Sequence, residues 1–150
     1  MGFDPDKLLK ELAETNPKVL FYPSSGFSHK GLFGMDYDIF ILADYCPQES
    51  VEKRKSCFKE MRESYPRLQL YKSTVRSRIC RIGDKWVFLF FQDNNEVFKR
   101  ILNAGLKISC FVGVNDGCSE GGNYECVNEL KWLEKVFNAF LNGRGIYIYY

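Results

Sequence analysis

The sequence predicts an α/β fold: a three-layer sandwich with a mainly parallel, Rossmann-like sheet and an antiparallel hairpin. Short apolar runs are interspersed with amphipathic helical segments, which is typical of this class. The run from Ile39 to Ala43 is apolar without alternation, as in strands covered on both faces. The turn residues Gly83 and Asp84 lie between two further strand-like runs, and this arrangement indicates a β-hairpin.

The size and composition of the chain predict one well-packed domain, 1–150. A chain of 150 residues can bury roughly 68–70% of its unfolded surface in a single core. Hydrophobic residues make up 45% of the chain and aromatic residues 16%, which argues against disorder. The net charge of +2 is too small to imply binding to a polyanion by itself. No apolar run approaches the ~20 residues of a membrane span, so we expect a soluble, cytoplasmic protein.

The first half of the chain contains clear helix and strand signals. Asp4 and Pro5 are suited to start a helix, because Asp can cap free amides and Pro loses no hydrogen bond at the first helical position. Pro17 ends it, since the residue before proline leaves the α region. A strand over 19–22 and a glycine-rich connection precede the strand over 39–43. A helix from Glu49 to Tyr65 follows and is closed by Pro66.

The second half continues the alternation of strands and helices. The expected strands cover 68–70, 75–82, 86–91, 106–114 and 146–150. Asp93 is the expected cap of a helix that ends before Gly105, and another helix is expected from Tyr124 to Asn142. An α+β arrangement is the alternative, because no helix separates the first two strands or the strands of the hairpin.

Two candidate site segments directly follow strands. The turn Ser24, Ser25 and Gly26 offers hydroxyls and backbone amides to a phosphate or carboxylate, although a plain tight turn explains it equally well. Asp44 and Tyr45 follow the next strand, and a strand-end carboxylate can bind a ribose hydroxyl, a metal or an amine, or act as a general base. The alternative role of Asp44 is to cap the next helix.

The third candidate is the long polar segment before the expected last helix. Asp116 and Glu120 provide carboxylates, while Gly121, Gly122 and Asn123 precede the free amides of the helix, which could bind an anion. A loop of this length is unusual without a function, although an elaborate helix start is the alternative. Because ligands bind at the carboxyl ends of strands in open α/β sheets, we expect all three segments along one edge, with Asp44, Asp116 and Glu120 as the catalytic candidates.

The cysteines and the single histidine suggest weaker alternatives. Cys46, Cys118 and Cys126 with His29 or Asp44 are acceptable zinc ligands, but their spacing is not diagnostic, and we assign no metal site. A cysteine nucleophile with His29 as its base is similarly unsupported by spacing. The six cysteines form no CxxC pair, so we expect reduced thiols.

A basic cluster marks the middle of the chain, with Asp84 as its only acidic neighbour: Arg67, Lys72, Arg76, Arg78, Arg81 and Lys85. Together with aromatics such as Tyr71 and Trp86, these residues could bind single-stranded nucleic acid. The favoured interpretation is a charged edge that prevents pairing between sheets, so nucleic acid is the less expected partner.

The segments 19–26 and 38–47 resemble parts of class I methyltransferase-type Rossmann domains, in which a strand runs into a glycine turn and a later strand ends in an Asp-aromatic-Pro-like motif. The chain lacks their GxGxG run. The resemblance implies S-adenosylmethionine or a nucleotide as cofactor and a transferase activity. We therefore expect a Rossmann-like domain that binds a nucleotide-like or anionic small molecule. A non-enzymatic interaction module that uses the basic hairpin 67–85 is the alternative, and whether the chain is an enzyme stays open.

Overall fold

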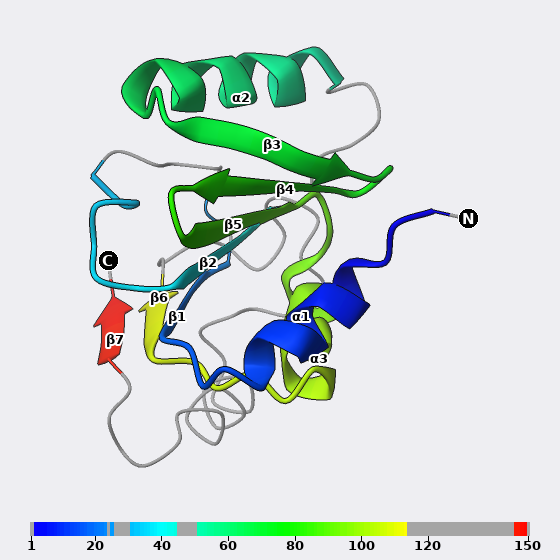
Figure 1. Cartoon of the computed structure of the whole chain (residues 1–150), viewed down its shortest axis with the longest axis vertical. Helices are drawn as coiled ribbons and strands as arrows, with labels where there is room; N and C mark the ends of the chain where they lie inside the picture. The colour runs from blue at the N-terminus through cyan, green and yellow to red at the C-terminus, as the bar shows by residue number, and fades with distance from the viewer. Residues whose placement is uncertain (1, 24, 26–30, 45–50, 114–145, 150) are drawn as a thin grey trace.

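The chain folds into a mixed α/β structure in the computed structural model, which describes residues 2–23, 25, 31–44, 51–113 and 146–149 (Figure 1). The elements in chain order are α1 (Pro5–Ala13), β1 (Val19–Tyr22), β2 (Ile39–Ala43), α2 (Val51–Ser64), β3 (Leu68–Ser73), β4 (Ser77–Ile82), β5 (Lys85–Phe90), α3 (Asn94–Asn103), β6 (Cys110–Gly113) and β7 (Ile146–Tyr149). The expected helix over 124–142 lies outside the described residues.

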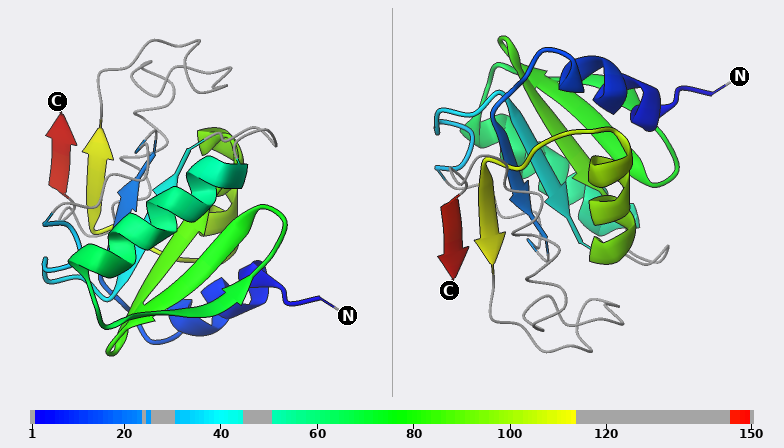
Figure 2. Two further views of the ribbon diagram at one scale, coloured as in Figure 1. Left: turned by 90° about the horizontal axis from the view of Figure 1, so that it is seen from above. Right: turned by 90° about the horizontal axis from the view of Figure 1, so that it is seen from below.

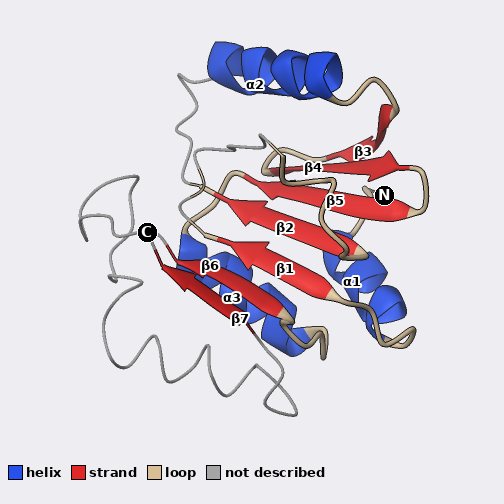
Figure 3. Ribbon diagram, turned by 90° about the vertical axis from the view of Figure 1, so that its left-hand side faces the viewer, coloured by secondary structure: helices blue, strands red, loops and turns tan. Residues whose placement is uncertain are grey.

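The described strands form one seven-stranded sheet in the order β3-β4-β5-β2-β1-β6-β7. The pairs β5–β2, β2–β1, β1–β6 and β6–β7 are parallel, whereas β4 is antiparallel to both of its neighbours. The arrows of the five parallel strands accordingly point the same way in Figure 3. The carboxyl ends of these strands therefore meet at one edge of the sheet, which we call the carboxyl edge.

The expected hairpin is confirmed and lies at one side of the sheet. Gly83 adopts a φ of 59° in the turn between β4 and β5, a left-handed conformation that glycine tolerates without steric cost. The first hairpin strand starts at Ser77 rather than at the expected Val75. The reason is a preceding turn, in which the Thr74 N–H donates to the Ser77 carbonyl over 2.9 Å and the two hydroxyls lie 2.6 Å apart.

One face of the sheet packs against α1 and α3. Phe21, Ile41 and Phe88 lie on this face and are fully buried together with Leu9 of α1 and Ile101 of α3. The α1 helix begins as expected, because the Asp4 side chain accepts a hydrogen bond from the N–H of Asp6 and Pro5 occupies the first turn. Figure 2 shows α1 and α3 on the side of the sheet opposite to α2.

The opposite face packs against α2. The strand residues that alternate with the first set, such as Phe40 and Leu89, form a second cluster with Met61 of α2. Phe58, one turn earlier on α2, packs at the margin of this cluster and stays partly exposed. The continuous burial of β2, at 1% or less of each side chain exposed, follows from having a cluster on both faces.

The described helices contain none that is both long and apolar enough to cross a membrane.

Candidate functional site

The carboxyl edge brings together segments that follow three neighbouring strands. Ser25 comes after β1, Asp44 directly after β2, and Asp93 shortly after β5. The Asp44 N–H donates to the carbonyl of Phe90 over 3.1 Å, and the Ser25 N–H donates to the carbonyl of Ala43 over 3.0 Å. These backbone bonds hold the three segments beside one another in the order of their strands.

Ser25 has a mainly structural position at this edge. Its side chain is only 6% exposed, and its hydroxyl donates to the Ala43 carbonyl over 3.3 Å, the same oxygen that its backbone N–H contacts. Both donors of Ser25 are therefore used to attach the β1–β2 connection to the end of β2.

Asp93 is a residue at this edge that sequence reasoning assigned only as a helix cap. It occupies the N-cap position of α3, and its Oδ1 is buried without a hydrogen-bond partner among the described residues. Burial raises the pKa of this carboxyl above its usual 3.8, against hydrogen bonds from Asn94 and Asn95 that lower it. The sequence did contain a signal for Asp93, because it is an acidic residue shortly after a buried strand. Asp44 was chosen as a candidate for the same reason.

Most of the other predicted site residues lie outside the described residues, where the structure gives no account of them: Ser24, Gly26, Tyr45, Asp116, Glu120, Gly121, Gly122 and Asn123. The same holds for the zinc and nucleophile candidates Cys46, Cys118, Cys126 and His29. The described cysteines Cys80 and Cys110 are buried as apolar residues, and burial raises the pKa of the Cys80 thiol to about 12. Within the described ranges, no group of three potential ligands could hold a metal ion.

The basic hairpin is divided between the two faces of the sheet. Arg81 lies on the α1 face, where its guanidinium carbon is 4.2 Å from the ring centroid of Trp86. Trp86 in turn contacts Tyr71 edge to face at 5.0 Å, so these aromatics form a packed cluster. Lys85 donates to the carbonyl of Met35 over 2.6 Å. The hairpin cations therefore do not form one continuous surface.

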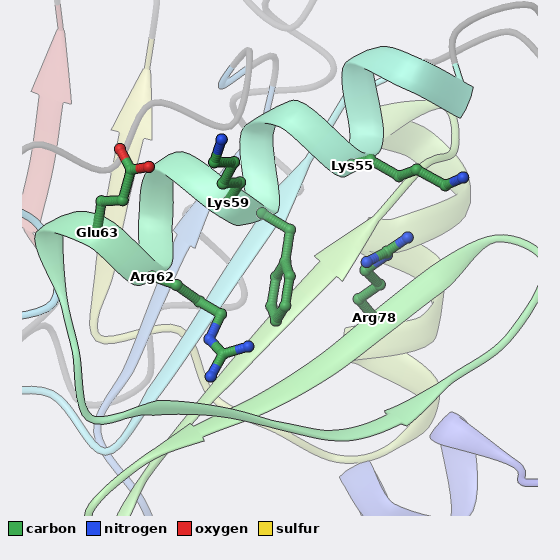
Figure 4. Close-up of a pocket in the computed structure, with 6 residues that line it drawn as sticks. Lys55, Lys59, Arg62, Glu63 and Arg78 are labelled. Carbon is green, nitrogen blue, oxygen red and sulfur yellow. The ribbon is translucent and has the colours of Figure 1, made fainter.

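Arg78 differs from these residues, because it lines an open groove with side chains of α2. The groove has a volume of ≈ 460 Å³ and is lined by Lys55, Phe58, Lys59, Arg62, Glu63 and Arg78 (Figure 4). The contribution of α2 to this groove was not predicted from the sequence. Its signal was the spacing of Lys55, Lys59 and Arg62, at i, i+4 and i+7 of one helix.

Comparisons with known proteins do not assign a family. No family model matches the chain, and a search of curated proteins finds no match. A solved structure, the N-terminal domain of the DNA packaging ATPase from bacteriophage phi29, is similar over 98% of this chain and 77% of that chain. The TM-score is 0.45 and the sequence identity 14%. This level of similarity leaves the function to be argued from the site itself.

Proposed function

We propose that the chain is a Rossmann-like domain of three layers that binds a small nucleotide-like molecule at the carboxyl edge. The observation that carries this proposal is the strand order around β1. The chain continues from β1 to β2 on one side, yet β6 pairs with β1 on the other side, through Phe21 and Phe111. Such a reversal is a topological switch point, and open α/β sheets bind their ligands outside the strand ends at that point.

The chemistry of the edge suits the hydroxyl-bearing part of such a ligand. Asp44 and Asp93 follow the adjacent strands β2 and β5, whose last residues Ala43 and Phe90 are paired. Carboxylates accept hydrogen bonds from ribose hydroxyls or from an amino group, and they repel phosphates. The N-terminus of α3 lies at the same edge, where the partial positive charge of the helix dipole favours an anionic group.

A transferase that uses S-adenosylmethionine or a nucleotide is the enzymatic form of this proposal. Asp44 and Asp93 are the described residues suited to the hydroxyl and amino groups of either molecule. The predicted roles of Asp116 and Glu120 remain part of the proposal, because the segment that contains them follows β6 at the switch point. We place the activity in the cytoplasm, in accord with the reduced thiols expected for Cys80 and Cys110.

A thermal shift screen tests the proposal directly. The protein is heated with S-adenosylmethionine, ATP, NAD and free ribose, and a ligand present at 100 times its dissociation constant should stabilise it by about 2.7 kcal/mol. The matched control is Asp84→Asn, which removes an exposed carboxylate from the β4–β5 turn at the opposite edge and should leave the shift unchanged. If none of these molecules raises the melting temperature, the proposal of a nucleotide-like ligand is wrong.

A further inference from the structure

The groove between α2 and β4 is separate from the residues of the carboxyl edge and has its own chemistry. Phe58 lies in the middle of its lining, with the guanidinium carbon of Arg78 5.4 Å from the ring centroid and that of Arg62 6.0 Å from it. Figure 4 shows Arg62 and Arg78 extending from the helix and from the strand into the space between them. The Phe58 ring is thus contacted by two positively charged side chains, one from α2 and one from β4.

The positive charge of the groove is not neutralised by described residues. Four of the six lining residues are cationic and one, Glu63, is acidic. The ion pairs among the described residues join Lys18 to Asp36, Lys99 to Glu96 and Arg100 to Asp6, so none involves a groove cation. With four cations and Glu63, the lining carries a net charge of +3, whereas the whole chain carries only +2. Like charges held close together favour an anionic ligand.

The cations are arranged as a line rather than as a ring. Lys55, Lys59 and Arg62 follow one face of α2 over seven residues, which is roughly 10 Å of helix. Arg78 faces this line from β4, where it pairs with Leu89 near the carboxyl end of β5. A ligand with phosphates in series fits this arrangement better than a ligand with one compact anionic group.

We propose that the groove binds the phosphodiester backbone of single-stranded nucleic acid without sequence preference. The lining offers four cations for contacts to phosphates, and such contacts position a nucleic acid without reading its sequence. The groove has a volume of ≈ 460 Å³ and is open to solvent, so part of a single strand can enter it. Positively charged grooves with aromatic side chains are typical of proteins that bind single strands. This proposed site differs from the alternative that the sequence raised for the hairpin 67–85, because α2 supplies three of its four cations.

Fluorescence anisotropy with a labelled oligothymidylate of about 20 nucleotides tests this proposal. Neutralisation of four phosphates predicts a slope of about 2.8 in log affinity against log salt, or a loss of about 50-fold in affinity between ~50 and ~200 mM salt. The double variant Lys55→Gln/Lys59→Gln should reduce the slope to about 1.4. The double variant Lys55→Arg/Lys59→Arg keeps both positive charges, so its slope should stay at about 2.8.

The matched control is Lys7→Gln/Lys10→Gln, which removes two exposed lysines from α1 and should leave the slope unchanged. Thermal melting of each variant establishes that the fold is retained. If the groove variant and the α1 variant lose the same amount of affinity for the oligonucleotide, only the net charge of the protein matters. That result would overturn the proposal. Tighter binding to duplex, full competition by ATP at the same phosphate concentration, or equal binding of polyglutamate would overturn it as well.

Discussion

Asp44 is attached to Phe90 by a backbone hydrogen bond of 3.1 Å, from the Asp44 N–H to the Phe90 carbonyl. The bond extends the parallel pairing of β2 and β5 by one step beyond Ala43. Asp44, the first residue after β2, therefore lies beside the segment that connects β5 to Asp93. The pairing of β2 and β5 therefore fixes the backbone position of Asp44.

Asp44→Asn should leave the melting temperature nearly unchanged and abolish the response to the ligand found by thermal shift. The backbone N–H that bonds to Phe90 is kept, and the amide retains the size of the carboxylate while losing its charge. The measurement is the melting temperature of both proteins with and without the ligand. A variant that melts lower but still responds to the ligand would identify Asp44 as a helix cap.

Asp93→Asn should stabilise the protein at pH 7 and have little effect near pH 4. Burial raises the pKa of the Asp93 carboxyl in the folded chain, so folding favours its protonated form. The stability from this group is fully present below the pKa of the unfolded chain, about 3.9, and is lost as the pH rises through the folded value. An uncharged Asn avoids that loss. Urea denaturation at the two pH values measures the difference, and a less stable variant at pH 7 would contradict this account.

Phe58→Leu should weaken oligonucleotide binding a few-fold while changing the free energy of unfolding by less than about 1.5 kcal/mol. The apolar side chain is kept at the margin of the α2 cluster, but the ring beneath Arg62 and Arg78 is lost, and such contacts contribute about 0.5–1 kcal/mol each at exposed sites. Phe58→Ala should also lose packing and unfold more easily, by about 1–3 kcal/mol. Unchanged affinity in Phe58→Leu would mean that the ring does not position the arginines.

Arg100→Leu should cost about 1–3 kcal/mol of stability, and Asp6→Asn less than about 1 kcal/mol. Arg100 donates to Asp6 over 2.7 Å and to Oε1 of Gln92 over 2.9 Å. Gln92 is only 7% exposed, so loss of Arg100 leaves a buried acceptor without this donor, whereas Asp6 is 48% exposed and can be solvated. Urea denaturation of both variants measures which of the two loses more stability. Equal costs would indicate that the α1–α3 ion pair dominates.

Much of the fold could be predicted because its signals are local. Asp4 and Pro5 start α1 by capping and by a preset dihedral angle, and Gly83 permits the hairpin turn, whatever the rest of the chain does. The burial of β2 followed from an apolar run without alternation. The start of β4 was predicted less accurately, at Val75 instead of Ser77. The Thr74–Ser77 hydrogen bonds that decide it depend on how the chain turns before the strand.

The candidate sites show the limit of the sequence more clearly. Consecutive side chains of a strand point to opposite faces, so Arg78 and Arg81 separate once β4 is formed, although they are near neighbours in the chain. The groove then depends on α2 packing above β4, a contact between segments that adjoin only in the folded protein. The burial that raises the pKa of the Asp93 carboxyl likewise depends on the folded chain, although its position after a strand was visible in the sequence.

By itself, the sequence determined the α/β class, most of the helices and strands, and the burial of the central strands, because capping, turns and apolar periodicity act over a few residues. The tertiary structure decided the strand order that creates a switch point at β1 and the selection of Arg78 for the α2 groove. The strand order and the groove both depend on contacts between segments that are distant in the sequence. The free energy of these contacts arises from the packing of the whole sheet and its helices, so no local sequence pattern contains it.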